Sequence, residues 1–447
     1  MRKWFLRAVG GFCLGAAAAV GLYFLPPVHD RLAWRVDNLV AQVHYLVYPP
    51  EKAVFVPQQS VDQIVQATLS AVFPSSTPGE TARPSETPAP SNTPSASAEA
   101  LLSPTAPSTP TTVPTPVPSS VLLKGVVHEY EKENNCGPAT LAMALTYWGW
   151  KGSQNDTAPF LKPNPKDKNV MPYELQNYIG QKTSFKSVLR YGGNEDLLKH
   201  LVAAGLVVIV EKGFEAVDLS GVLSWMGHYE AIIGYNDAAS TFYAEDSYSQ
   251  KDDNTPLAVS YKEMDANWRA FNYTYLVIYP QDRQAQVFSI LGPQADEQAD
   301  YRYAAQKASD EIPTLAGRDL FFAWFNRGSS LVDLQDYGGA ASAYDQAFAV
   351  YPSIPDKKRP WRMLWYQTGP YFAYFYSGRY ADVINLASTT LDAASEPALE
   401  ESWVWRARAE AATGNTTAAI SDLRTSLQWH PGFAPALDAL NSLGATP

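Results

Sequence analysis

Hydrophobic residues and glycines form one uncharged run near the N-terminus, from Ala8 to Leu25. As a helix, this run is about 27 Å long, which is close to the thickness of the hydrocarbon core of a membrane. Arg2, Lys3 and Arg7 precede the run, and positive charge on that side predicts a cytoplasmic N-terminus. We therefore expect residues 1–25 to be a single-pass transmembrane anchor, with the C-terminal domains extracytoplasmic at the cell membrane.

A cleaved signal peptide is the alternative interpretation of the same run. The small residues Ala16–Ala19 could precede a cleavage site, and cleavage there would release the protein by secretion. The apolar run continues beyond these residues to Leu25, and this length favours the uncleaved anchor.

The hydrophobic pattern is weaker over the next two segments of the chain. Residues 26–73 carry a modest helical periodicity, with Leu39, Val40, Val43 and Val47 on one side, which predicts a juxtamembrane helical segment. Residues 74–119 are rich in Pro, Ser and Thr, a mixture that cannot bury a core. We expect this second segment to be a disordered linker that works as a stalk.

Regular periodicity returns over residues 120–282. Apolar residues at helical spacing follow Cys136 as far as the stop signal at Gly149, and later stretches rich in β-formers are separated by turn residues. These patterns predict an α+β domain with a largely antiparallel sheet. The expected helices are 136–148, 172–179 and 195–203, and the expected strands are 187–189, 206–210, 229–235, 241–244 and 273–279.

Residues 301–447 form an all-helical array whose spacing resembles the tetratricopeptide repeat. One unit is marked by Trp324, Gly328, Leu331, Tyr337, Ala340, Tyr344, Ala347 and Pro352. A second is marked by Trp403, Ala407, Ala419, Leu423 and Pro431, and a more diverged unit around Tyr371, Tyr374, Gly378 and Tyr380 lies between them. The resemblance implies a short superhelix that binds a protein partner, or a scaffold that only stabilises or spaces the preceding domain.

The composition of the chain limits its possible partners and bound groups. A chain of 447 residues with 46% hydrophobic content can build more than one core, and its net charge of −11 argues against a nucleic-acid partner. Cys13 lies in the apolar N-terminal run and Cys136 in the α+β domain, so we expect no disulfide between them. His29 and His44 have no partners at ligand spacing, and we expect no metal site and no bound cofactor.

Cys136 is the predicted nucleophile. It opens a helix, where free N–H groups and the helix dipole favour the thiolate over the thiol. We expect Asn134 or Asn135 to cap this helix with its side chain. A buried structural cysteine is the alternative, but the position between polar residues and Gly137-Pro138 favours chemistry.

A cysteine nucleophile needs a base, and His228 is best placed among His128, His200 and His228 because it opens a predicted strand. A hairpin centred on Asp237 would pair His228 with Asp246 on the next strand. A two-residue loop would instead pair it with Glu245, because a slip of one residue exchanges the two faces of a strand. Asn-Asp is a poor two-residue turn, so we favour Asp246 as the residue that orients His228.

The segment from Asn134 to Leu145, together with Gly227-His228-Tyr229 and Asp246, resembles the bacteriocin-processing, or double-glycine, cysteine peptidases of the papain-like superfamily. The resemblance implies a papain-like fold with Cys136 as nucleophile, His228 as base and Asp246 as orienting acid.

Members of this family usually carry a glutamine five or six residues before the cysteine, where it helps to form the oxyanion hole. This chain has Tyr130 and Glu131 there. An ionised carboxylate would repel a developing oxyanion. Glu131 in its protonated form, Asn134 and Asn135 are the candidate donors.

The sequence thus predicts a membrane-anchored, extracytoplasmic cysteine peptidase that cleaves a peptide or protein substrate through a thioester at Cys136. Two alternatives remain. The domain could be a weak or inactive module that binds peptides or proteins on a repeat scaffold, or it could use the same triad for acyl transfer to an amine.

Overall fold

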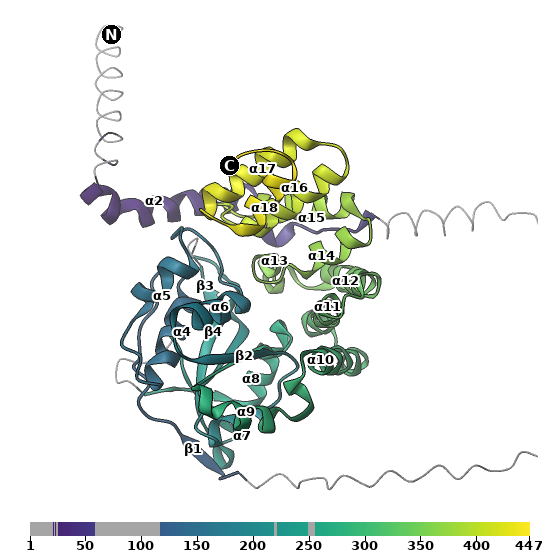
Figure 1. Ribbon diagram of the computed structural model, residues 1–447. Coiled ribbons are helices and arrows are strands. Elements are labelled where there is room, and N and C mark those ends of the chain that lie inside the picture. Colours follow the sequence, from purple (N-terminus) through teal and green to yellow (C-terminus); the bar gives the residue numbers. More distant parts are fainter. Residues whose placement is uncertain (1–20, 22, 24–25, 59–116, 219–220, 249–254) are drawn as a thin grey trace, which may run out of the picture.

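The computed structural model describes residues 21, 23, 26–58, 117–218, 221–248 and 255–447 (Figure 1). Of the predicted anchor, residues 1–20, 22 and 24–25 lie outside the described residues, and so do residues 74–116 of the predicted linker at 74–119. Within the described ranges, no helix combines the length and the apolar character needed to cross a membrane. The first described helix, α2, spans Pro26–Val47, within the segment where a juxtamembrane helix was expected.

An antiparallel sheet forms the centre of the first domain. Its strand order is β2-β7-β3-β4-β5-β6, with β1 paired to β4. The strands are β1 (Ser120–Leu122), β2 (Lys186–Arg190), β3 (Val208–Val217), β4 (Leu223–Asn236), β5 (Thr241–Glu245), β6 (Leu257–Ser260) and β7 (Tyr275–Tyr279). The prediction of an α+β domain with an antiparallel sheet is therefore confirmed.

Helices cover both faces of this sheet, so its central strands are apolar on both sides. On one face, Ile209 and Ile233 pack against α4 (Cys136–Tyr147), α5 (Gln154–Leu161) and α6 (Pro172–Lys182). On the other face, Val210 and Ile232 pack against α7 (Glu195–Ala203), α8 (Tyr261–Trp268) and α9 (Gln284–Leu291). Helix α7 lies where the sequence predicts it, whereas α5, β6 and α8 were not predicted.

Strands β3 and β4 are longer than the sequence pattern indicates. The pattern ends at Val210 because Glu211 and Lys212 follow, yet β3 continues to Val217 with both of these residues buried. The ammonium group of Lys212 pairs with the carboxylate of Glu230 on β4. This ion pair compensates the charge that would otherwise end a buried strand.

The hairpin between β4 and β5 differs from both predicted registers. Its loop contains the 3-10 turn Asp237–Ala239 and Ser240, whose φ of 49° is left-handed. Asn236 pairs with Thr241, and after an irregularity near Ile232 the register pairs Ala231 with Glu245. Strand β5 ends at Glu245, so His228 has neither Asp246 nor Glu245 as its cross-strand partner.

The C-terminal residues form a stack of helices beside the sheet domain, which we call the helical region (residues 297–447; Figure 1). Its helices are α10 (Glu297–Glu311), α11 (Gly317–Asp333), α12 (Tyr337–Val350), α13 (Met363–Tyr366), α14 (Gly369–Tyr376), α15 (Tyr380–Asp392), α16 (Glu400–Ala412), α17 (Thr416–Trp429) and α18 (Ala434–Ser442). A side chain at Gly328 on α11 would place its Cβ 2.7 Å from the ring of Tyr344 on α12, so a small residue there permits close helix packing. The region is helical as predicted, and its assignment to the tetratricopeptide repeats stays a prediction.

The sheet domain and the helical region share a hydrophobic core. Trp225 on β4 and Phe271 stack at 5.7 Å between ring centroids, and Trp225 also contacts Phe322 on α11 and Tyr366 on α13. Phe55, from the segment after α2, joins the same core. Three parts of the chain that are far apart in sequence are therefore packed together around the start of β4.

Candidate active site

Cys136 is held at the start of α4 by contacts between this helix and β4. Thr140 Oγ1 donates a hydrogen bond to the backbone carbonyl of Tyr229 over 3.0 Å. A Cβ atom at Gly137 would lie 3.2 Å from Val170 and 3.5 Å from the ring of Tyr229, so the first turn of the helix lies close to the strand. Because Tyr229 follows His228, these contacts bring the cysteine to the histidine.

Neither asparagine caps this helix with its side chain, which corrects the sequence prediction. Asn135 is buried, and its side-chain amide donates to Gln154 Oε1 over 3.0 Å. Gln154 also accepts a hydrogen bond from the backbone N–H of Lys132 over 2.8 Å. Asn135 therefore helps to fix the segment before the cysteine, and the first turn of α4 keeps N–H groups that no Asn side chain accepts.

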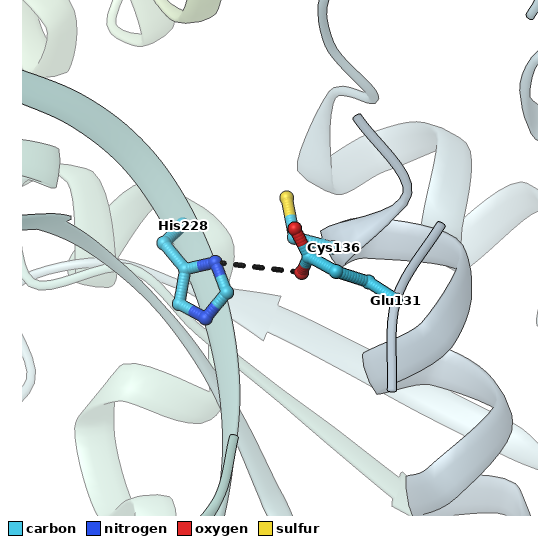
Figure 2. A group of neighbouring side chains, drawn as sticks. All are labelled: Glu131, Cys136 and His228. Atoms are coloured by element: carbon cyan, nitrogen blue, oxygen red, sulfur yellow. Dashed lines mark ion pairs between the residues drawn. The ribbon is translucent and has the colours of Figure 1, made fainter. Parts of the chain in front are cut away.

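The ring of His228 lies between the cysteine and an acid. Its Nε2 is 3.2 Å from Asp246 Oδ1, and its Nδ1 is 3.9 Å from Glu131 Oε2. A nitrogen of His228, the Sγ of Cys136 and a carboxylate oxygen of Glu131 all lie within 4.8 Å of one another, and Figure 2 shows these three groups facing one another. Burial alone would lower the pKa of His228, but the contacts with Asp246 and Cys136 outweigh it and raise this pKa well above its ordinary value.

Asp246 is positioned by its own partners just beyond the end of β5. It is 1% exposed, and its Oδ1 accepts the backbone N–H of Tyr248 over 2.7 Å. Its other oxygen lies 3.9 Å from Lys212 Nζ. The Nε2–H group of His228 can thus donate to a carboxylate whose orientation is already fixed.

The other acid and the other histidines of the domain have separate partners. Glu245 Oε2 lies 3.2 Å from Nδ1 of His128, and burial lowers the pKa of this histidine. His200 is on α7, where its Nδ1 lies 2.7 Å from the backbone carbonyl of Asp196. The structure therefore brings together Cys136, His228 and Asp246, and it places Glu245 beside His128.

Glu131 lies beside the cysteine, at the position where a glutamine was expected from the sequence resemblance. Its backbone N–H donates to the carbonyl of Ser247 over 3.0 Å, and its Oε2 accepts a hydrogen bond from Ser247 Oγ over 2.6 Å. Asn134 also lines the cavity beside Cys136, and its φ of 54° is left-handed. Of the three predicted oxyanion candidates, Glu131 and Asn134 line this cavity, whereas Asn135 turns toward Gln154.

The site opens into a cavity of about 310 Å³, which we call the site cavity. Three parts of the chain form its walls. The sheet domain contributes Cys136, His228 and Glu131; helix α2 contributes Ala41 and Tyr45; and the helical region contributes Arg362, Trp365, Tyr366 and Ser395. Sequence analysis missed the walls from α2 and the helical region, because no local pattern relates residues so distant in the chain to Cys136.

The α+β domain thus brings a cysteine, a histidine and an acid together beside one cavity. Residues 123–276 match the Peptidase_C39 like family. Among solved structures, the chain is similar to a protein described as a C39-like peptidase from Bacillus anthracis, with 16% sequence identity and a TM-score of 0.29 over 36% of this chain and 98% of that one. No curated protein matches this chain.

Proposed function

We propose that this chain is a cysteine peptidase in which Cys136, His228 and Asp246 form the catalytic triad. The observation that carries the proposal is the position of the His228 ring, with Nε2 on Asp246 and the cysteine sulfur within 4.8 Å on the other side. The match of residues 123–276 to a family of C39-like peptidases supports the same chemistry.

The reaction runs through a thioester. The thiolate of Cys136 attacks the carbonyl carbon of the scissile peptide, and the S–C bond forms as the C–N bond breaks. Protonated His228 donates its proton to the leaving amine. The neutral ring then takes a proton from water, the resulting hydroxide attacks the thioester, and the carboxylic acid leaves as the thiolate is restored with His228 protonated again.

The raised pKa of His228 supports this role because it favours the imidazolium that must protonate the leaving amine. Asp246 keeps the ring in one orientation and stabilises its positive charge. The backbone N–H of Cys136 is one donor for the oxyanion. A carboxylate at Glu131 would repel the negative charge of the oxyanion and so lower the rate of the reaction.

The surroundings of the site support a peptide or protein substrate. Aromatic side chains from the helical region, Trp365 and Tyr366, line the same cavity as the cysteine. A segment of substrate bound there would contact the helical region and the sheet domain together. We propose that the tetratricopeptide-like helices bind a protein partner or present the substrate, and that the apolar run at 8–25 anchors the enzyme with this site outside the cell.

A thiol-directed electrophile tests the proposal. We expect Cys136 to be labelled at neutral pH much faster than an ordinary free thiol, and we expect His228→Ala to slow this labelling. If Cys136 reacts at the rate of a free thiol and the His228 variant changes nothing, the domain is not a peptidase. Product analysis with added amines then separates hydrolysis from acyl transfer, since transfer would give an amide in place of the free acid.

A further inference from the structure

A second group of titratable side chains lies where the sheet domain meets the helical region. Asp167 comes from the loop between α5 and α6, Glu400 begins α16, and His430 follows the end of α17. Nδ1 of His430 is 2.7 Å from Glu400 Oε1 and 3.9 Å from Asp167 Oδ2. One atom from each of the three side chains lies within 4.8 Å of the others.

One atom of this group lacks the partner that its burial requires. Asp167 and Glu400 are each 3% exposed. Asp167 Oδ2 is buried and has no hydrogen-bond partner among the described residues. A buried carboxylate oxygen without a partner carries a large desolvation cost. Nearly all buried polar atoms in proteins are hydrogen-bonded, so an unpaired one requires an explanation such as a missing ligand.

The charges around this group are also unbalanced. Glu174 and Glu401 lie close enough to interact with Asp167, so the interface gathers four carboxyl groups. The cationic side chains that interact with Asp167 are Lys162, Lys168 and His430. A bound cation would favour the ionised form of these carboxyl groups and balance their charge.

We propose that Asp167, Glu400 and His430 form a binding site for a divalent transition-metal cation, with Zn²⁺ as the best fit. One imidazole nitrogen and two carboxylate oxygens are ligands that Zn²⁺ accepts, and water can fill a fourth position. Bonds of about 2.0–2.2 Å in a tetrahedron place neighbouring ligand atoms about 3.3 Å apart. The two distances from His430 Nδ1 lie on either side of this value, so small side-chain shifts would complete the geometry.

A cation at this site would also hold in place the loop between α5 and α6, which contacts the segment before Cys136. Lys162, at the start of this loop, donates from Nζ to the backbone carbonyl of Asn134 over 2.8 Å. Asn169 and Val170, near its end, line the site cavity. A cation held by Asp167 on this loop and by two residues of the helical region would join the two parts of the chain beside the active site.

Metal titration of the full chain tests this site. The catalytic group Glu131, Cys136 and His228 could also bind Zn²⁺, so every protein in the test carries Cys136→Ser to remove that thiolate. After treatment with a chelator, this parent is titrated with Zn²⁺ by calorimetry, and its metal content is measured after gel filtration. We expect the parent to retain about one equivalent, and we expect Asp167→Asn combined with His430→Gln to weaken binding at least about 100-fold.

The matched control is His200→Gln, which removes a half-buried histidine on α7 and should leave Zn²⁺ binding unchanged. Because the double variant could fold poorly, Glu400→Gln provides a second test, with Co²⁺ as a spectroscopic probe and circular dichroism as the check on folding. The proposal fails if the parent retains no Zn²⁺, or if folded ligand variants bind it as tightly as the parent. Binding is measured in a catalytically inactive background, so its outcome is independent of the peptidase proposal.

Discussion

Nε2 of His228 lies 3.2 Å from Oδ1 of Asp246, although the two residues are not cross-strand partners in the sheet. His228 is within β4, and Asp246 follows the last residue of β5. The acid reaches the ring because the chain leaves the sheet at this point, where the backbone N–H of Tyr248 binds the same carboxylate oxygen.

This contact predicts that Asp246→Ala lowers kcat by about 10²-fold with a smaller effect on KM, since His228 loses the acceptor that orients it. Asp246→Asn should retain more activity, because its carbonyl oxygen can still accept from Nε2–H. The measurement is steady-state kinetics on a peptide substrate. Glu245→Ala is the matched control, as Glu245 lies beside His128, and equal losses in Asp246→Ala and Glu245→Ala would contradict the assigned role.

Glu131→Gln should raise kcat. The amide keeps an oxygen to accept the hydrogen bond from Ser247 Oγ, and it adds an N–H donor where the carboxylate has none. One oxyanion-hole donor is worth about 10²-fold or more in kcat, so we expect a gain of about 10-fold to 100-fold.

Glu133→Gln, which changes another acid of the site cavity, is the control for the loss of negative charge. An unchanged or lower kcat in Glu131→Gln would show that this position does not limit the reaction. A gain of the same size in both variants would assign the effect to the overall charge of the cavity.

Gly227→Ala should destabilise the contact between the sheet domain and the helical region. The new Cβ would lie 2.7 Å from the ring of Phe271 and 3.0 Å from that of Tyr366, and both rings are buried in the shared core. Overpacking of this kind costs about 1–3 kcal/mol, so Tm in a thermal unfolding experiment should fall. Gly180→Ala on α6 meets no atom within 4 Å and should leave Tm unchanged or raise it.

The stability of the fold should decrease as the pH rises toward neutrality, in part through Asp300. This residue on α10 accepts the backbone N–H of Tyr191 over 2.9 Å, and burial raises the pKa of its carboxyl group to about 7. The folded state therefore holds the proton more tightly than the unfolded state does. The associated stability is fully present below the unfolded pKa near 4, and it is lost as the pH rises through 7.

Thermal unfolding at pH 5 and pH 8 measures this effect. We expect Tm to fall between these values in the parent chain and to fall less in Asp300→Asn, which cannot ionise. A pKa raised by about three units corresponds to at most about 4 kcal/mol. The same pH dependence in both proteins would exclude Asp300 as its source.

Local patterns in the sequence predicted much of the secondary structure. Helix α7 lies at the expected residues because Asn194 caps it and apolar residues recur at helical spacing. The pattern failed where tertiary contacts override local preference, as at Lys212, whose charge is compensated by Glu230 on the adjacent strand. It also failed for the β4–β5 hairpin, because an irregularity between Ile232 and Gly234 changes the register without any clear mark in the sequence.

The sequence by itself determined which residues could carry the chemistry. A cysteine at the start of a helix, a histidine on a strand and an acid after the next strand are all visible as local features. Only the tertiary structure decided that Asp246 lies beside His228 while Glu245 lies beside His128, since this depends on where β5 ends. It alone brought Arg362 and Trp365 to the cavity and Asp167 to His430, because such contacts arise from the packing of distant segments around a shared core.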